Sequence, residues 1–239
     1  MPCIGRFAPS PTGRMHLGNR YTAYASYLRA RQQGGKWIVR IEDIDPQRSK
    51  PEFAKQILDD LDWLGLRWDG LYYQTERYER YELALSRLET FPLYKSRKER
   101  LSVGAPQAGD NHVAMHTQKP ATAIRIPNAD GTSEDIILRR SDGAWAYQLA
   151  VVVDDAEMGV TEVVRGDDLA CCVQYHHYLQ DLLGYPHPIY KHIPLLYNEA
   201  GQRLCKRDKD MDMGELRKRY SPAGLRGILE GKLRENGVI

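Results

Sequence analysis

Cysteine is scarce in this chain of 239 residues, which contains only four. Their spacing has none of the regularity of a disulfide framework, and a cytosolic chain would keep them reduced. They are Cys3, Cys171, Cys172 and Cys205. Long apolar runs are also missing, because no stretch approaches the ~18 residues that a membrane span needs. The N-terminus lacks the apolar core of a signal peptide. We therefore expect a cytoplasmic protein with no membrane association.

An excess of charge of one sign is a third absence. Lysine and arginine total 34 residues against 32 of aspartate and glutamate, which leaves a formal net charge of +2. So small a charge gives no strong global attraction to nucleic acid, and such a partner would need a local basic patch. The basic segment 216–226 is one candidate, although a solvated helix face explains it equally well. The length suits one large domain or a domain with an insertion.

Strands and helices alternate through the first part of the chain. The predicted elements are a strand over 3–8, a helix from His16 to about Gly34, a strand over 37–41, and helices over 49–64 and 78–88. A loop follows the first strand, because two prolines and a glycine interrupt residues 9–13. Ser49 and Glu52 have the spacing of a capping box, which would start the second helix.

The segment 91–135 differs from its surroundings. It has no sustained helical period and is dotted with Gly, Pro, Asn and Asp, so we expect an insertion of short strands and loops. A strand over 136–138 follows it. The apolar run 149–153 is typical of a strand buried on both faces of a parallel sheet. A strand over 160–164 and helices over 169–183 and 222–233 complete the prediction.

This order of elements predicts an α/β fold, in which a doubly wound parallel sheet is split by a smaller α+β module and followed by a short C-terminal helical segment. The expected parts are 1–90 and 136–200 for the two halves of the sheet domain, 91–135 for the insertion and 201–239 for a loop and the C-terminal helices. Ligands of such sheets bind outside the carboxyl ends of the strands. Each acidic pair that follows a predicted strand should lie near that crevice: Glu42 and Asp43, and Asp154 and Asp155.

The segment 6–19 carries the first chemical motif. A strand runs into a proline-fixed loop, and a helix starts at His16. A helix N-terminus offers unpaired backbone N–H groups and the positive end of a dipole to a phosphate. Gly18 has no Cβ, so a flat ligand such as adenine can lie against the backbone. His16 and Asn19 are one turn apart and can donate to phosphate oxygens from one side.

This segment resembles the "HIGH" region of class I aminoacyl-tRNA synthetases, in the version found in glutamyl- and glutaminyl-tRNA synthetases. Residues 6–13 read Arg-Phe-Ala-Pro-Ser-Pro-Thr-Gly, as the opening strand of those enzymes does. Further blocks resemble the same family in the same order: 40–45, 145–155, 164–169 and the "KMSKS"-like 203–207. The resemblance implies a class I Rossmann-like fold and the use of ATP with Mg²⁺.

The length narrows the resemblance. Full glutamyl- and glutaminyl-tRNA synthetases continue into an anticodon-binding domain, whereas this chain ends soon after the 203–207 block. It is similar in this to the short paralogues of the family, the glutamyl-Q tRNA(Asp) synthetases. Those enzymes activate glutamate and attach it to the queuosine base of tRNA(Asp). The implied partners are L-glutamate and queuosine-containing tRNA(Asp), and family members of this length are usually monomers.

The resemblance also implies the residues of a glutamate pocket, namely Arg6, Phe7, Ala8, Pro9, Ser10, Glu42, Tyr147 and Arg165. The residue types suit the ligand. Arg6 and Arg165 offer guanidinium forks for carboxylates, Glu42 can take the ammonium, and Tyr147 can donate from its hydroxyl. Because glutamine has no side-chain charge, Arg165 is our candidate for choosing glutamate over glutamine. The alternative for Arg165 is a surface ion pair with Asp167 or Asp168.

For the nucleotide, the implied catalytic residues are His16, Asn19 and Lys206. The implied ATP-binding residues are His16, Gly18, Asn19, Arg203, Leu204, Lys206 and Arg207. They would position the phosphates and stabilise their charge, so no protein nucleophile is needed. Cys205 stands where the family usually has serine. A thiol is a weaker donor, which puts that contact in doubt.

The insertion departs from the family pattern. The short paralogues commonly carry a zinc site there, but Leu93 and Lys95 occupy the first cysteine positions. His112 and His116 have the spacing of the second pair, yet two histidines without a thiolate make a poor structural zinc site. We therefore predict that zinc is absent and that no side chains of the protein form a metal site, with magnesium carried in on ATP. Activation of glutamate is better supported than its transfer, which leaves open a non-tRNA acceptor or a non-catalytic tRNA-binding role.

Overall fold

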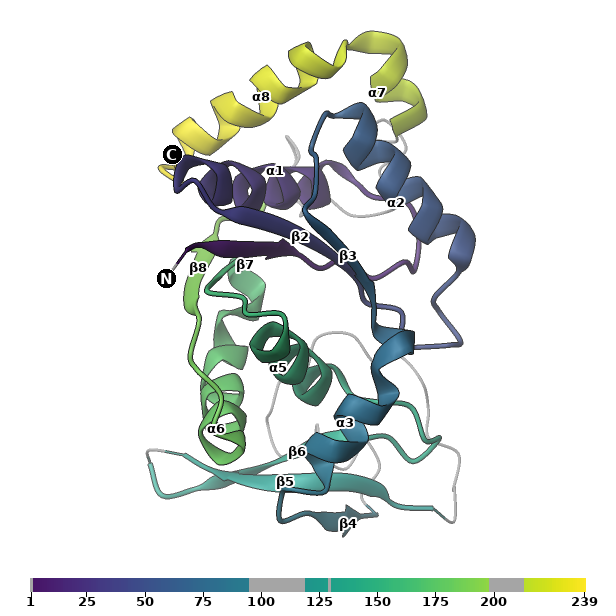
Figure 1. The fold of residues 1–239 in the computed structure, drawn as a ribbon, viewed down its shortest axis with the longest axis vertical. Helices are drawn as coiled ribbons and strands as arrows, with labels where there is room; N and C mark the ends of the chain where they lie inside the picture. Colours follow the sequence, from purple (N-terminus) through teal and green to yellow (C-terminus); the bar gives the residue numbers. More distant parts are fainter. Residues whose placement is uncertain (1, 95–118, 129, 198–212) are drawn as a thin grey trace.

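The computed structural model describes residues 2–94, 119–128, 130–197 and 213–239. Its centre is a parallel sheet with the strand order β3-β2-β1-β7-β8 (Figure 1). The strands are β1 (Ile4–Phe7), β2 (Lys36–Ile41), β3 (Gly70–Tyr73), β7 (Glu162–Gly166) and β8 (Ile189–Ile193). The order changes direction at β1, which has strands of the first half of the chain on one side and strands of the second half on the other.

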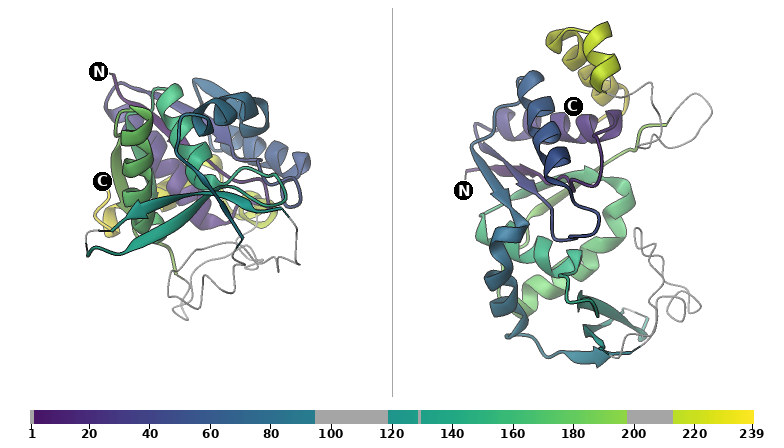
Figure 2. Two further views of the ribbon diagram at one scale, coloured as in Figure 1. Left: turned by 90° about the horizontal axis from the view of Figure 1, so that it is seen from below. Right: turned by 90° about the vertical axis from the view of Figure 1, so that its right-hand side faces the viewer.

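Helices cover both faces of this sheet (Figure 2). On one face lie α1 (Leu17–Gln32) and α2 (Pro51–Trp63), and on the other lie α5 (Tyr147–Glu157) and α6 (Val173–Leu183). A short turn of 3₁₀ helix (Gln74–Arg77) leads into α3 (Tyr78–Leu85), which packs beside α5. A second such turn (Asp167–Cys172) leads into α6. The α/β doubly wound fold that the sequence predicts is confirmed.

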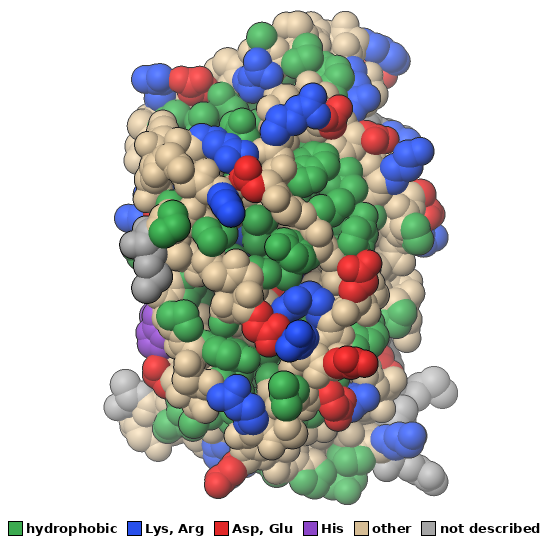
Figure 3. Space-filling view, in the orientation of Figure 1, with side chains coloured by type: hydrophobic (Ala, Val, Ile, Leu, Met, Phe, Trp, Pro, Cys, Tyr) green, Lys and Arg blue, Asp and Glu red, His purple; other side chains and the backbone are tan. Residues whose placement is uncertain are grey.

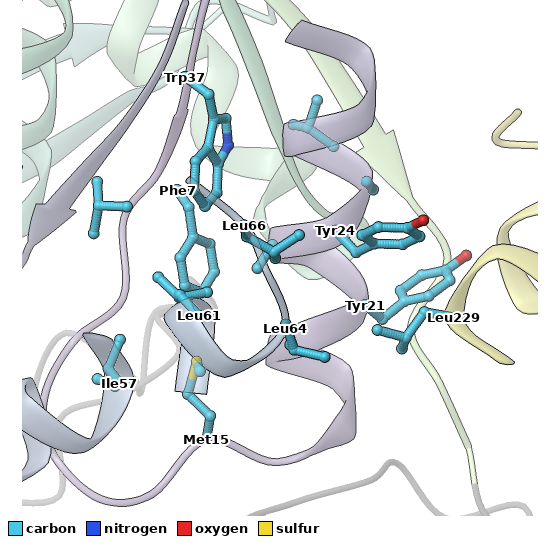
Figure 4. Close-up of a cluster of buried hydrophobic side chains, with 14 of the residues drawn as sticks. Phe7, Met15, Tyr21, Tyr24, Trp37, Ile57, Leu61, Leu64, Leu66 and Leu229 are labelled. Carbon is cyan, nitrogen blue, oxygen red and sulfur yellow. The ribbon is translucent and has the colours of Figure 1, made fainter. Parts of the chain in front are cut away.

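The largest hydrophobic core lies between the sheet and the helices α1 and α2 (Figure 4). Strand residues Phe7 and Trp37 stack with ring centroids 6.4 Å apart, and Trp37 Nε1 donates to Ser26 Oγ at 2.9 Å. Leu61 of α2 and its C-cap Leu64 pack into the same cluster. Gly65 follows the cap with φ +72°, a backbone conformation that favours glycine and ends the helix.

A second sheet is small and antiparallel. It consists of β4 (Phe91–Leu93), β5 (Ala121–Pro127) and β6 (Ser133–Arg139), in that order. Its inner residues, such as Ile124 and Leu138, join a second core with α3, α5 and α6. The boundary expected between residues 135 and 136 falls inside β6, so the strand predicted over 136–138 is part of this small sheet rather than of the parallel one.

The last helices are α7 (Met213–Arg219) and α8 (Pro222–Glu235). They pack against the first helices of the chain, as Figure 1 shows. Arg217 Nη2 donates to Asp60 Oδ1 at 3.1 Å, and Arg226 Nη1 donates to the Leu64 carbonyl at 2.7 Å. Two arginines of the basic segment 216–226 thus hold the C-terminal helices on α2.

Two local predictions were wrong. The run 149–153 is not a strand but the middle of α5, which is helical from Tyr147 to Glu157 and buried on every side over that run. Over so short an apolar run, periodicity does not distinguish a buried strand from part of a buried helix. The residues that flank the run determine how long the element is. The capping box is also absent: Lys50 is the N-cap of α2 without a side-chain hydrogen bond, and Pro51 takes the first helical position.

The face drawn in Figure 3 mixes basic and acidic side chains with hydrophobic ones, in keeping with the small net charge. Of the described helices, none is long and apolar enough to cross a membrane.

Candidate active site

A cavity of about 800 Å³ opens at the carboxyl ends of β1 and β7. This is the place where the strand order changes direction, which is the usual ligand site of a doubly wound sheet. The recorded pairing between β1 and β7 joins Gly5 to Glu162, early in both strands. Beyond that pair, Arg6 Nη1 reaches across and donates to the Val164 carbonyl at 3.4 Å. Residues that follow this pair in the two strands, Phe7 and Arg165 among them, line the cavity.

The structure brings the predicted site residues together. Those that line the cavity are Arg6, Phe7, Ala8, Pro9, Ser10, His16, Gly18, Asn19, Glu42, Tyr147 and Arg165. They come from β1 and the loop after it, the start of α1, the end of β2, the start of α5 and the strand β7. The remaining predicted residues, Arg203, Leu204, Lys206 and Arg207, lie outside the described residues, as does Cys205.

His16 caps α1. Its Nδ1 accepts from the Gly18 N–H at 3.1 Å, and Asn19 Oδ1 accepts from the His16 N–H at 3.1 Å, which together form a capping box. Because Nδ1 is an acceptor, the proton of the neutral ring lies on Nε2. The donors at this helix start are therefore the His16 Nε2–H and the Asn19 amide. They stand beside the positive end of the helix dipole.

Gly18 suits this cap because it leaves room for the capping ring. A Cβ at Gly18 would lie 3.0 Å from both Cε1 and Nδ1 of His16, so the ring would have to shift by a few tenths of an ångström. The missing side chain also leaves the backbone of the first turn open to the cavity. The geometry suits a flat or phosphorylated ligand at the start of α1.

Behind the cavity wall, Arg40 of β2 is completely buried and is surrounded by carboxylates. Its Nη1 donates to Asp155 Oδ1 at 2.6 Å, and its Nη2 donates to Glu42 Oε1 at 3.2 Å. Its Nε lies 3.6 Å from Asp154 Oδ2. Burial alone would lower the pKa of Arg40, but the carboxylates, Asp155 first, raise it above its ordinary value.

Two carboxylates of this cluster, Glu42 and Asp155, respond in opposite ways to this arrangement. Burial raises the pKa of Glu42 above its ordinary value, although Arg40 and Arg6 oppose the shift. For Asp155, burial also acts to raise the pKa, but Arg40 and Arg6 outweigh it and lower the value. Arg6 Nε lies 3.4 Å from Asp155 Oδ1, so Asp155 serves two guanidinium groups at once. Glu42 stays at the cavity surface beside them.

Arg165 of β7 has a different environment. Its side chain is buried, and its Nε donates to His192 Nε2 at 3.3 Å. Its Nη2 donates to the Leu169 carbonyl at 3.0 Å, and its guanidinium lies 4.8 Å from the centre of the Tyr190 ring. Its Nη1 lies 3.5 Å from the Tyr147 hydroxyl and 3.4 Å from His176 Nδ1.

All of these partners are neutral. Burial first and Arg165 second lower the pKa of His176 to about 3, and the same two causes lower the pKa of His192. In the part of the chain that is described, no carboxylate oxygen lies within 4.0 Å of an Arg165 guanidinium nitrogen. The alternative of an ion pair with Asp167 or Asp168 is therefore not found. Burial without an opposite charge is costly for a cation, and a bound anion would relieve that cost.

Sequence reasoning missed several contacts that shape the site. Arg40 and Asp155 are 115 positions apart in the chain, so their contact leaves no local pattern. His176 and Cys172 stand four positions apart, a spacing that could also suit a pair of metal ligands. In the structure His176 instead faces Arg165, and Cys172 Sγ accepts from Gln148. Within the described ranges, no group of three or more His, Cys, Asp or Glu side chains is placed to hold a metal ion.

Three comparisons with known proteins agree with this geometry. Residues 3–90 and 109–222 match the family described as tRNA synthetases class I (E and Q), catalytic domain. The glutamyl-Q tRNA(Asp) synthetase of Neisseria meningitidis serogroup C is 45% identical over 84% of this chain and 79% of its own length. The proteins of that name from Nitratidesulfovibrio vulgaris and Deinococcus radiodurans are 42% and 39% identical, over 92% and 94% of this chain and 82% and 86% of their own.

Solved structures show the same likeness. The glutamate-tRNA synthetase of Elizabethkingia anophelis has a TM-score of 0.69 and 26% identity over 88% of this chain, and this chain spans 54% of it. A glutamate tRNA ligase from Elizabethkingia meningosepticum, solved in complex with its amino acid, has a TM-score of 0.67 and 26% identity over 88% of this chain and 53% of its own. The chain is accordingly a ligase that belongs to the glutamyl- and glutaminyl-type family of class I tRNA synthetases.

Proposed function

We propose that this chain activates L-glutamate with ATP to form glutamyl adenylate, and then transfers the glutamyl group to the queuosine base of tRNA(Asp). The observation that carries the first step is Arg165, a buried guanidinium whose described contacts are all with neutral groups. Such a cation favours an anionic ligand over a neutral one of the same shape. Glutamate meets this requirement and glutamine does not.

The rest of the cavity fits an amino acid with two carboxylates. Arg6 lies on the β1 side and Arg165 on the β7 side, so each can take one carboxylate. Glu42 supplies a carboxylate for the ammonium, and Tyr147 supplies a hydroxyl between them. The backbone of residues 7–10 forms the wall next to Arg6. We propose that these groups bind glutamate, with Arg165 on the side-chain carboxylate.

The start of α1 would hold ATP. The Nε2–H of His16 and the amide of Asn19 would donate to phosphate oxygens, and Gly18 would lie under the adenine. Lys206 would add a positive charge to the leaving phosphates, helped by Arg203 and Arg207. Magnesium would enter with ATP, because Mg²⁺ prefers phosphate and water oxygens as ligands, and it would neutralise part of the phosphate charge.

The chemical step is a displacement at phosphorus. An oxygen of the glutamate α-carboxylate forms a bond to the α-phosphorus, and the bond from that phosphorus to the bridging oxygen breaks. The electron pair of the broken bond leaves with pyrophosphate. The protein contributes alignment of the two substrates and stabilisation of charge on the phosphate oxygens. A hydroxyl oxygen of the acceptor would then form a bond to the carbonyl carbon of the adenylate. The bond from that carbon to the phosphate oxygen would break, AMP would leave with the electron pair, and the hydroxyl proton would be released.

The acceptor is supported by the relatives. Proteins named glutamyl-Q tRNA(Asp) synthetase resemble this chain over most of its length and theirs. We propose that the small antiparallel sheet and the cavity mouth bring the modified base of tRNA(Asp) to the adenylate.

The activation step is tested by exchange of labelled pyrophosphate into ATP, measured without tRNA. We expect exchange with L-glutamate, and at least about 100-fold less with L-glutamine, the scale of a site whose buried polar group is left unpaired by the wrong substrate. Absence of exchange both with and without tRNA would contradict the activation and favour a non-catalytic tRNA-binding role.

The acceptor needs a second measurement. Charging with labelled glutamate should succeed with queuosine-containing tRNA(Asp) and fail with the same tRNA lacking the modification. Exchange without charging of either tRNA would leave the activation standing and point to a non-tRNA acceptor, such as an amine or a carrier protein.

A further inference from the structure

We propose that Gln148 and His176 are positioning residues for glutamate selection, forming a neutral hydrogen-bonded relay that orients Arg165 and keeps it without a protein anion. This inference rests on the proposed binding of glutamate at Arg165. It assigns a task to two residues that need not touch the substrate.

The relay joins α5, α6 and β7. Arg165 Nη1 on β7 lies 3.4 Å from His176 Nδ1 on α6. His176 Nε2 lies 2.7 Å from Gln148 Oε1 on α5. Gln148 Nε2 donates in turn to Cys172 Sγ at 3.7 Å. Cys172 and Gln148 line the cavity, while His176 is 1% exposed, so the relay runs from the cavity wall into the core and returns to Arg165.

Arg165 fixes the direction of every hydrogen bond in this relay. A guanidinium has only donors, so the atom facing it, His176 Nδ1, must be an acceptor. The proton of the neutral ring is then on Nε2, which donates to Gln148. That bond requires the carbonyl oxygen of the Gln148 amide, and the amide nitrogen is left to donate to Cys172 Sγ. The orientation of the Gln148 amide agrees with this sequence of donors and acceptors at each step.

The same reasoning applies to the second ring on Arg165. Nε of Arg165 donates to His192 Nε2, so the proton of His192 is on Nδ1. The Leu169 carbonyl accepts from Nη2 on the remaining side. The Tyr190 ring covers the face of the guanidinium, and the Tyr190 hydroxyl lies 3.4 Å from His176 Nδ1. The guanidinium is thus held on its edges and on one face.

The charged groups around His176 explain why it stays neutral. Arg165 faces it from β7 and Arg6 from β1, and both disfavour the imidazolium. Asp155 of α5 favours the imidazolium but is already engaged by Arg40 and Arg6, while the neighbouring His177 on α6 opposes it. Tyr147, Tyr190 and Gln148, the other groups packed against the ring, are uncharged. Burial acts in the same direction as the two arginines.

Neutral partners have a consequence for selectivity. A carboxylate at position 176 would orient Arg165 equally well, but it would also neutralise the positive charge that the side-chain carboxylate of glutamate is proposed to bind. Histidine supplies an acceptor without a charge, provided that Gln148 holds its tautomer. The relay therefore combines two properties, a fixed guanidinium and an uncompensated charge, which together discriminate between a carboxylate and an amide.

The kinetic test uses glutamate-dependent pyrophosphate exchange with three variants. His176→Leu removes the acceptor, and we expect the KM for glutamate to rise about 10- to 100-fold with the KM for ATP unchanged, the scale of a hydrogen bond lost from a charged group. His176→Asn keeps an oxygen in the place of Nδ1 and should recover most of this loss. His177→Asn makes the same change one residue further along α6, on a ring stacked against His187, and serves as the matched control. Equal losses in His176→Leu and His176→Asn, or a parallel rise in the KM for ATP, would overturn the positioning role.

A change of charge at Gln148 gives a sharper test. Gln148→Glu keeps the shape of the side chain and the acceptor for His176, but its carboxylate stabilises the imidazolium form of His176. In that form Nδ1 carries a proton, so it can no longer accept a hydrogen bond from Arg165. We expect the KM for glutamate in this variant to rise as the pH falls from 8 to 6, while that of the unmodified protein changes little over the same range. Identical pH profiles would overturn the relay, because a merely structural Gln148 would not create a new titration.

One readout is independent of activity. Nitrogen NMR of protein labelled in histidine should show His176 as the neutral Nε2–H tautomer without any substrate, with the signal assigned by its loss in His176→Asn. The Nδ1–H tautomer would overturn the inference. If the protein showed the Nε2–H tautomer of His176 but no exchange with glutamate, the proposed function would fail while the relay stood.

Discussion

Two buried arginines near the same cavity have opposite electrostatic environments. Arg40 sits behind the wall, is inaccessible to solvent and faces Asp154, Asp155 and Glu42. Arg165 sits in the wall and faces a carbonyl, imidazole rings and tyrosines. A guanidinium that only supports structure can be neutralised by the protein. A guanidinium whose described contacts are all with neutral groups, as those of Arg165 are, keeps its charge available for a ligand.

The largest effect expected from this difference is on stability. Arg40→Leu would leave the carboxylates of the cluster without their shared cation, and we expect the free energy of unfolding to fall by about 3–5 kcal/mol. Arg165→Leu removes a buried charge that has no counter-charge, so its unfolding free energy should stay within about 1 kcal/mol of the original or rise. Urea denaturation of both variants measures this contrast. Equal destabilisation by the two substitutions would break the comparison.

The second effect is on substrate affinity, for which we expect substitution of Arg165 to matter more than substitution of Arg40. Arg165→Ala should lower kcat/KM for glutamate by about 100-fold, as expected for loss of a charged hydrogen-bonding partner, with the KM for ATP nearly unchanged. Pyrophosphate exchange over a range of glutamate and ATP concentrations provides the measurement. An equal loss for both substrates would mean that Arg165 supports the fold of the site rather than glutamate binding.

The third effect concerns pH. Because the pKa of His176 is lowered from 6.5 to about 3 in the folded protein, the unfolded chain takes up a proton on this residue between those values and the folded chain does not. The stability contributed by neutral His176 is therefore complete above pH 6.5 and decreases as the pH falls, by up to about 1.4 kcal/mol per pH unit. His176→Asn removes this dependence. Urea unfolding of both proteins at pH 7.0 and 5.5 should show a smaller pH effect in the variant, and equal pH effects would contradict the neutral environment of His176.

The smallest effect is expected at the outer end of the relay. A thiol is a weak acceptor, and Gln148 donates to Cys172 over 3.7 Å. Cys172→Ala should therefore raise the KM for glutamate by no more than about twofold, because losing a weak neutral hydrogen bond costs little. Steady-state exchange at several glutamate concentrations resolves a change of this size. A tenfold rise would mean that Cys172 contacts the substrate directly.

Local sequence signals predicted one part of the site and could not predict the other. The prolines after β1, the helix start at His16 and the glycine at position 18 determine backbone geometry over a few residues, so their pattern is visible in the sequence. Glu42 follows β2 directly and was expected at the crevice for that reason. The cluster on Arg40 and the relay on Arg165 join residues from different elements, and nothing near Gln148 or His176 indicates their partners.

The prediction over 149–153 failed for a related reason. Valine is a good strand former, and the run is short enough for a buried strand, but α5 is surrounded by α3, α6 and the small sheet, so every face of it needs apolar residues. Burial from all sides removes the helical period from the sequence. For that reason Asp154 and Asp155 were predicted to follow a strand. They lie within α5 instead, and Asp155 accepts hydrogen bonds from Arg6 of β1 and Arg40 of β2.

The packing of α8 on α1 determines when the apolar side of this first helix can be covered during synthesis. Leu225, Leu229 and Leu233 share a core with Tyr21 and Tyr24 of α1, and Asn236 donates to the Tyr21 hydroxyl across 215 positions of chain. A ribosome releases the N-terminal half first, so the apolar side of α1 stays uncovered while most of the chain is being made. Contacts of such large sequence separation also form late in folding. The helix that starts at His16 is therefore translated well before α8, the helix that covers this side of it.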